Sequence, residues 1–127
     1  MKSRFARSTF IPSILIAAIL SLWVNHATAI NLMFLSKESP AGQFSDTDWQ
    51  FLNRAIDHSL EKVGDGASYH WDNPKSPASG LIEMLGSFKE DDMPCRRMRM
   101  TNHYNEIKGI TEFVFCKQPD GEWKVLR

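Results

Sequence analysis

The feature that most constrains the fold of this chain is a pair of cysteines, Cys95 and Cys116, set in two segments of alternating character. Residues 95–100 read Cys-Arg-Arg-Met-Arg-Met, and residues 111–116 read Thr-Glu-Phe-Val-Phe-Cys. A period of two is typical of strands that bury one face. The two segments are therefore predicted to be antiparallel neighbours in one hairpin.

One register satisfies three pairings at once. With the turn centred near residues 105–106, the two cysteines face each other, at a separation that a disulfide can bridge. The other two pairs are Met98 with Phe113 and Arg99 with Glu112. A structural cross-strand disulfide is predicted, and closing its loop of about 20 residues would stabilise the domain by roughly 3 kcal/mol.

A third strand is predicted after a tight turn. Residues 118–122 read Gln-Pro-Asp-Gly-Glu, in which proline presets φ, aspartate bonds its own backbone and glycine accepts a positive φ. The chain then folds back as a strand over residues 123–126. On this register the core side of the sheet carries Met98, Met100, Phe113, Phe115, Trp123 and Val125.

The first 29 residues have the three parts of a secretory signal peptide. Three cations, Lys2, Arg4 and Arg7, precede an apolar run over residues 14–24, and Ala27-Thr28-Ala29 forms a cleavage site. Cleavage before Ile30 is predicted. The alternative is an uncleaved membrane anchor, although the apolar run is shorter than the roughly 20 residues of a spanning helix.

Cleavage would leave 98 residues, enough for one small domain. The whole chain balances 15 Lys and Arg against 15 Asp and Glu, and the signal removes three cations, so the remainder is acidic. This charge argues against a nucleic-acid partner. No cysteine lies near the cleavage site, so the exported chain is expected not to be lipidated. The predicted organisation is a signal peptide (1–29), a mature N-terminal segment (30–43) and an α+β domain (44–127).

The segment from Ile30 to Leu35 is apolar and is expected to pack on the domain. The alternative is a surface for a partner or a membrane interface, because contiguous exposed apolar residues usually mark a contact. Residues 36–42 are predicted to be a polar connector.

A helix is predicted over about residues 46–63, after the cap residue Ser45 and before the stop signal of Gly64. Its apolar stripe consists of Trp49, Leu52, Ile56, Leu60 and Val63. Asp57, His58 and Glu61 fall on the outward side. His58 and Glu61 could share a metal ion, but a solvated helix face is the preferred interpretation.

Two further strands complete the predicted sheet, over residues 67–71 and 80–88. The second could be a helix by hydrophobic count, but closely spaced glycines at both ends favour a strand. Residues 89–92 form a charged turn. The predicted fold class is α+β, with an N-terminal amphipathic helix packed on a small antiparallel sheet of about four to five strands and one cross-strand disulfide.

The order and spacing of several short motifs over residues 44–127 resemble the bacterial surface-antigen domain family, of the outer-membrane seventeen-kilodalton antigen type. These motifs are Trp71-Asp72-Asn73-Pro74, Gly80, Cys95-Arg96, Cys116 and Asp120-Gly121-Glu122-Trp123. The resemblance implies an exported cell-envelope protein of no established enzymatic activity. Family members often carry a lipidated cysteine and a glycine-zipper segment, and this sequence has neither. A soluble periplasmic or weakly attached protein is therefore expected.

The resemblance marks one set of residues as structural. They are Trp71, Asn73, Pro74, Gly80, Arg96, Asp120, Gly121 and Trp123. Arg96 shares the parity of Met98, and it is expected to pass the sheet end or to bond loop carbonyls near Asn73.

Four residues are candidates for contact with a ligand or partner: Arg97, Arg99, His103 and Tyr104. Arg97 and Arg99 are predicted on the cystine face of the sheet, where arginines can hold carboxylate or phosphate groups. The plainer alternative is a solvated face with cross-strand ion pairs. His103 and Tyr104 are predicted in the hairpin loop, a common place for binding residues.

The sequence contains no G-x-S-x-G, no H-E-x-x-H and no paired-cysteine metal spacing. A binding or structural module without a cofactor is therefore expected, and the alternative is a small periplasmic hydrolase or an enzyme inhibitor. The expected partner is an unknown envelope component or protein. Membrane contact is expected only through an uncleaved signal segment or the apolar Ile30 to Leu35 stretch.

The cleavage site gives the first testable prediction. The exported protein should be recovered in the periplasmic or outer-membrane fraction with Ile30 as its first residue, because the Ala27-Thr28-Ala29 site directs cleavage there. Intact-mass and N-terminal peptide mass spectrometry of the fractionated protein measures this directly. Recovery of the exported chain with residues 1–29 still attached would contradict the prediction.

Overall fold

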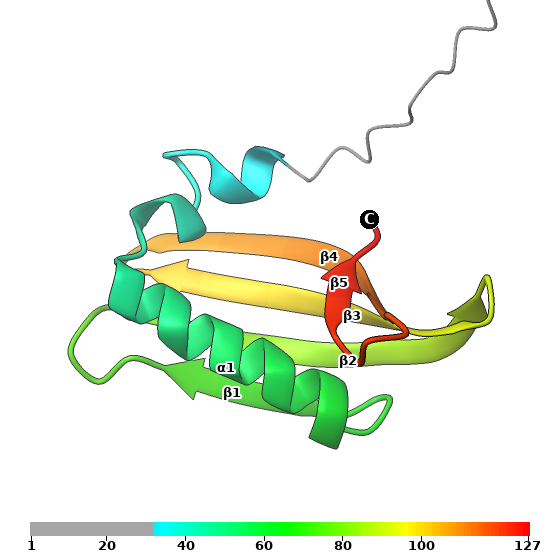
Figure 1. Cartoon of the computed structure of the whole chain (residues 1–127). Helices are drawn as coiled ribbons and strands as arrows, with labels where there is room; N and C mark the ends of the chain where they lie inside the picture. Colours follow the sequence, from blue (N-terminus) through cyan, green and yellow to red (C-terminus); the bar gives the residue numbers. More distant parts are fainter. Residues whose placement is uncertain (1–31) are drawn as a thin grey trace, which may run out of the picture.

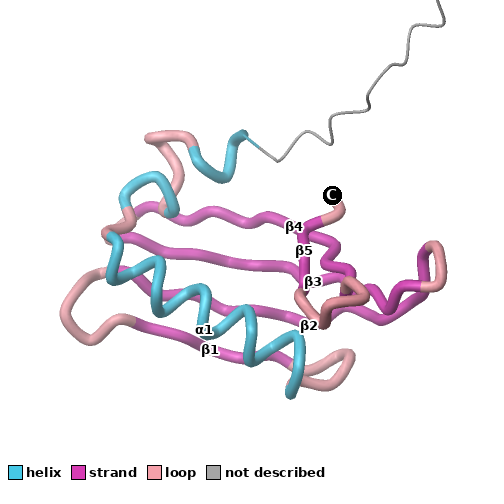
Figure 2. Tube along the Cα trace, viewed as in Figure 1, coloured by secondary structure: helices cyan, strands magenta, loops and turns pink. Residues whose placement is uncertain are grey.

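A computed structural model of the chain describes residues 32–127, so the predicted signal peptide and its cleavage site lie outside the described residues. One helix packs on a five-stranded antiparallel sheet whose strands follow chain order, β1-β2-β3-β4-β5 (Figure 1). The elements are η1 (Leu32–Leu35), η2 (Ala41–Gln43), α1 (Asp46–Lys62), β1 (Ser68–Asp72), β2 (Ala78–Glu90), β3 (Met93–Tyr104), β4 (Ile107–Lys117) and β5 (Trp123–Val125). Figure 2 shows how α1 lies across one face of the meander, while the short 3-10 helices η1 and η2 lie toward β4.

The predicted hairpin register is confirmed. Cys95 pairs with Cys116 and the two form a disulfide, with Cα atoms 4.0 Å apart. The other predicted pairs, Met98 with Phe113 and Arg99 with Glu112, are also present. Both cysteines are buried, because apolar side chains that include Phe88, Val114 and Leu126 pack around the disulfide on its face of the sheet.

The strand interpretation of residues 80–88 is also confirmed, because they lie within β2, which pairs with β1 and β3. The register of β2 against β3 shifts between Met84 and Gly86, which is the mark of a β-bulge. The charged turn that follows has positive φ at Asp91 and Asp92, of 48° and 62°. Such a pair of left-handed residues suits a two-residue hairpin loop.

Helix α1 begins with a capping box. The Ser45 side chain accepts a hydrogen bond from the Asp48 backbone, and the Asp48 carboxylate accepts one from the Ser45 backbone. The predicted apolar stripe faces the sheet: Leu52 is fully buried, Leu60 is buried, and the other stripe residues are partly buried against the core. The core below the helix consists of Trp71, Ala78, Ile82, Met84, Met98, Met100, Phe113 and Phe115.

The prediction that Val125 belongs to the core is wrong. Val125 has the parity of Phe115, with which it pairs, but its side chain is 45% exposed. The reason is that β5 is only three residues long and is an edge strand, paired with β4 alone. Trp123, at the other end of β5, is partly buried against the core, and its Nε1 donates to Glu61 Oε1 over 2.6 Å.

The apolar segment before the helix packs on the domain through Phe34, as expected. The Phe34 ring makes edge-to-face contacts with Trp49 and Phe113, with centroids 6.0 and 5.2 Å away. Leu35 is exposed, and Ile30 lies outside the described part of the chain. Farther along, Pro40 lies against Gly109, where a Cβ would stand 2.9 Å from the proline Cδ.

Arg96 extends from β3 to the C-terminal end of α1. Its Nη1 donates to the carbonyls of Ser59 and Leu60 over 3.0 and 2.8 Å. Its Nη2 donates to the Val63 carbonyl over 2.7 Å and to the Asp65 carboxylate over 2.8 Å. The fifth donor, Nε, bonds the Ser87 hydroxyl over 3.1 Å. The guanidinium therefore bonds carbonyls of the C-terminal end of the helix, where the last four carbonyls generally lack a partner within the helix; the Ser59 carbonyl also accepts from the Val63 N–H.

Arg96 bonds backbone carbonyls, as one of its two predicted roles required, but the predicted position of those carbonyls is wrong. The guanidinium does bond carbonyls, but those of the helix end and not those near Asn73, because α1 lies directly over this end of the sheet. Hydrogen bonds from Arg96 and Ser87 also lower the pKa of Asp65 below its ordinary value.

Asn73 instead fixes the other end of the helix. Its Nδ2 donates to the Asp48 carboxylate over 2.7 Å, and both side chains are buried. Burial raises the pKa of Asp48, but hydrogen bonds from Ser76, Ser45 and Asn73 outweigh it and hold that pKa below its ordinary 3.8. One carboxylate thus joins the start of α1 to the β1–β2 loop.

This arrangement predicts a pH-dependent contribution from Asp48. Because its folded-state pKa is lowered, the contribution is complete at neutral pH and is lost as the pH falls through the folded value. The Asp48→Asn variant should lose about 1–3 kcal/mol of unfolding free energy at neutral pH, and its difference from wild type should shrink below about pH 3.8. Urea unfolding across this pH range measures the difference.

The matched control is Asp57→Asn, which changes an exposed carboxylate on the same helix. It should alter the unfolding free energy by less than about 0.5 kcal/mol. An Asp48→Asn deficit that stays constant down to pH 3 would show that the contact owes nothing to the carboxylate charge.

Candidate functional site

The sheet has one covered and one open face. Helix α1 and the η1–η2 segment lie on one face, and no element within residues 32–127 lies across the other (Figure 1). Alternation along β3 assigns Cys95, Arg97, Arg99, Thr101 and His103 to this open face. One end of it is closed by a small apolar cluster around the disulfide, made of Cys95, Cys116, Val114, Phe88, Met93 and Leu126. We call this surface the cystine face.

Arg99 is engaged in cross-strand ion pairs. Its Nη2 and Nε donate to Glu112 Oε1 over 2.8 and 3.1 Å, and Glu83 lies 4.0 Å away on the opposite side. The three residues form one row across β2, β3 and β4. Arg99 therefore fits the plainer prediction of an ion-paired sheet face.

Arg97 is different. Its side chain is exposed, its strand neighbours are Gly86 and Val114, and it makes no ion pair with any residue of the described part. It lines a shallow depression with Arg127, whose guanidinium binds both carboxylate oxygens of Glu90 over 3.1 and 3.0 Å. The two predicted contact arginines do not act as a matched pair, since only Arg97 keeps its donors available.

The prediction that His103 and Tyr104 lie in a loop is wrong. Both are the last residues of β3, because only Asn105 and Glu106 are needed for the turn. They also point to opposite faces. His103 falls on the cystine face, whereas Tyr104 packs against the core beside Phe44, with ring centroids 6.2 Å apart. The structure thus places Arg97, Arg99 and His103 on one face and removes Tyr104 from it.

The centre of the cystine face is mostly apolar, with a threonine between two aliphatic side chains. Leu81, Thr101 and Ile110 form a row across β2, β3 and β4, and Ile110 is 59% exposed. This row lies between the Glu83–Arg99–Glu112 row and a polar row of Ser79, His103 and Lys108. An apolar strip edged by charge is a surface that can be covered by a partner.

A second site lies on the helix face and involves Asn102, a residue that the sequence analysis did not select. Its side chain is 2% exposed, and neither its Oδ1 nor its Nδ2 has a hydrogen-bond partner in the described residues. Asn102 stands in a row with Trp71, Gly80 and Gly109 across four strands. A Cβ on Gly80 would lie 2.5 Å from Trp71 Nε1 and 2.6 Å from Asn102 Oδ1, so this position requires glycine.

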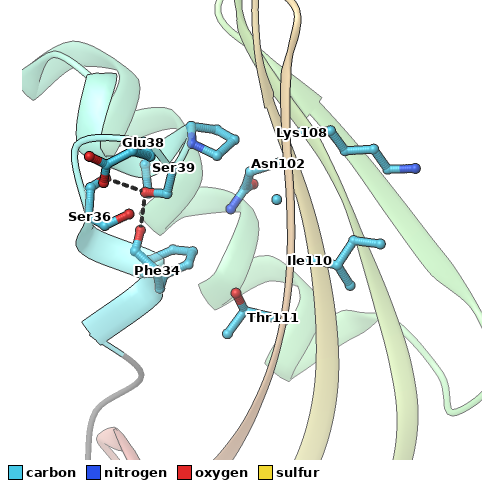
Figure 3. Close-up of a pocket in the computed structure, with 11 residues that line it drawn as sticks. Phe34, Ser36, Glu38, Ser39, Asn102, Lys108, Ile110 and Thr111 are labelled. Carbon is cyan, nitrogen blue, oxygen red and sulfur yellow. Dashed lines mark hydrogen bonds between the residues drawn. The ribbon is translucent and has the colours of Figure 1, made fainter.

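Asn102 borders a pocket of about 230 Å³ between the η1–η2 segment and the β3–β4 pair. The pocket is lined by Phe34, Ser36, Glu38, Ser39, Pro40, Ala41, Asn102, Lys108, Gly109, Ile110 and Thr111. In Figure 3, Asn102 and Thr111 point toward the η1–η2 segment, while Lys108 and Ile110 point to the other side of the sheet. The sequence contained a signal for this site: the alternation of Met98, Met100 and Asn102 puts a polar residue on the side of β3 that faces the core.

His58 and Glu61 of α1 were the alternative metal ligands, and the Glu61 carboxylate is engaged in hydrogen bonds with other side chains. Glu61 accepts hydrogen bonds from Trp123 and Lys117, which lower its pKa. The His58 ring lies on Tyr69, with centroids 4.5 Å apart. Across residues 32–127, no group of three or more His, Cys, Asp or Glu side chains is arranged to hold a metal ion. Over the same range, no helix combines the length and hydropathy needed to cross a bilayer.

Comparisons with known proteins do not assign this chain to a family. A scan against protein-family models finds no match, and searches of curated proteins and of solved structures find no significant match either. The resemblance to the surface-antigen family therefore stays a prediction from the sequence motifs.

Proposed function

We propose that this protein is an exported cell-envelope binding or structural module, periplasmic or associated with the outer membrane, that acts without catalysis and without a lipid anchor. The observation that carries the proposal is the cystine face, on which an apolar strip and an available arginine are presented by a disulfide-closed sheet. A disulfide is typical of proteins in oxidising compartments, which agrees with the signal peptide predicted from the sequence.

The chemistry of the cystine face suits a protein partner. Ile110 and Leu81 offer an apolar centre, and Arg97 offers donors that can bind a carboxylate in two places. Interfaces commonly combine a buried apolar centre with a polar rim, and arginine is frequent among the residues that matter most for binding. The Glu83–Arg99–Glu112 row would then act mainly in orienting the partner, since its one arginine is already paired within the sheet.

The proposal predicts cross-linking from this face only. A photoreactive phenylalanine analogue at position 110 or 97, introduced in cells that export the protein, should form an adduct with one envelope component. The same analogue at position 75, an exposed residue in the β1–β2 loop, should not. Mass spectrometry of the adduct identifies the partner, whose binding to Arg97→Glu should be weaker by about tenfold than to the control Lys75→Glu.

Two results would contradict the proposal. Adducts of equal yield from positions 75, 97 and 110 would indicate random collision rather than a binding face. An adduct whose partner is a substrate converted by this protein would favour the alternative of a small hydrolase, and an adduct with an enzyme that it inactivates would favour an inhibitor.

A further inference from the structure

The pocket beside Asn102 has features of a ligand site that the cystine face does not use. Buried polar groups in folded proteins nearly always have partners, so each exception calls for a missing partner. Here the Asn102 amide is buried, and neither of its polar atoms has a hydrogen-bond partner in the described residues. Thr111, on the neighbouring strand, is also a buried residue and lines the pocket. Both point toward the η1–η2 segment (Figure 3).

The orientation of the Asn102 amide follows from its neighbours. Its Oδ1 and the Nε1–H of Trp71 both lie beside Gly80, although neither atom has a hydrogen-bond partner in the described residues. This leaves Nδ2, a donor, for the pocket side, where Figure 3 shows the nitrogen directed. The buried end of the pocket therefore offers an N–H donor from Asn102 and, from Thr111, a hydroxyl that can donate or accept.

The charge of the pocket excludes an anion as the best ligand. Among the described residues that line it, one charged side chain lies on the η1–η2 side, that of the exposed Glu38, and Lys108 points to the other face of the sheet. A carboxylate would lose its hydration without meeting an opposite charge, which is costly in a buried site. A neutral carbonyl oxygen has no such cost.

The remaining lining selects the size and shape of the ligand. The Phe34 ring and the Pro40 and Ala41 side chains form an apolar wall, and the volume of about 230 Å³ fits a group of side-chain size rather than a large cofactor. We propose that this pocket binds a primary carboxamide group (–CONH₂), whose carbonyl accepts from Asn102 Nδ2 and whose N–H donates to Thr111 Oγ1. Such a group occurs in the side chain of glutamine or asparagine of a peptide and in small free amides.

Nuclear magnetic resonance of the full chain, labelled with nitrogen-15, tests this inference. The probe is N-acetylglutamine N-methylamide, and its matched controls are the glutamate and methionine analogues, which replace the carboxamide by a charged and an apolar group. The side-chain NH₂ signals of Asn102 should shift with the glutamine probe and not with either control. Propionamide separates the two sources, since a response to it as strong as to the glutamine probe assigns the site to small amides.

Two variants keep the test independent of Asn102 itself. Thr111→Val removes one hydroxyl with little change of shape and should weaken binding of the glutamine probe about tenfold. Thr101→Val makes the same change on the cystine face and should leave the affinity unchanged. Equal shifts with all three peptide probes, or no shift of the Asn102 amide together with a long-lived bound water at its Nδ2, would overturn the inference, because the pocket would then be a hydrated cavity only.

Discussion

The structure depends above all on the hydrogen bonds of the Arg96 guanidinium, which join β3 to the C-terminal end of α1. All five of its N–H donors have acceptors: three carbonyls at the end of α1, the Asp65 carboxylate and the Ser87 hydroxyl. The side chain is only 13% exposed, so removal of any acceptor or donor would leave a buried polar group without a partner, which costs more than the bond itself contributes. Lysine could not replace it, because an ammonium offers three donors from one point and not a planar fork.

The disulfide and the Arg96 hydrogen bonds hold the same end of β3, from opposite faces of the sheet. Cys95 locks β3 to β4 on the cystine face, and the next residue, Arg96, reaches α1 on the other face. At the opposite end of the helix, Asp48 and Asn73 fix the start of α1 to the β1–β2 loop. With α1 held over β1 and β2 at both ends, the part of the sheet near β4 is left to the η1–η2 segment (Figure 1). The pocket beside Asn102 and the open cystine face both follow from this division.

The sequence predicted the features that are determined by residues close together in the chain, namely the hairpin register and the helix. Strict alternation from Cys95 to Met100 and from Thr111 to Cys116 determined the register, and the Ser45 cap and apolar stripe determined the helix. It did not predict contacts that depend on where α1 lies, such as the bonds of Arg96 to carbonyls more than 30 residues earlier in the chain. The face of Tyr104 was missed because the turn was taken to be longer than two residues. Asn102 was visible as a polar residue in a core row, but the pocket beside it forms only when residues 34–41 fold back over β4.

The most direct test of this account compares two conservative substitutions on the same strand. Arg96→Lys keeps the charge and loses the fork, whereas Arg99→Lys makes the same change on the open face, where the side chain is 41% exposed. The account predicts that Arg96→Lys lowers the free energy of unfolding by at least about 2 kcal/mol and speeds hydrogen exchange in the last turn of α1. Arg99→Lys should lower it by less than about 0.5 kcal/mol. Equal losses in the two variants, with unchanged exchange at the end of α1, would contradict the claim that Arg96 sets the position of the helix.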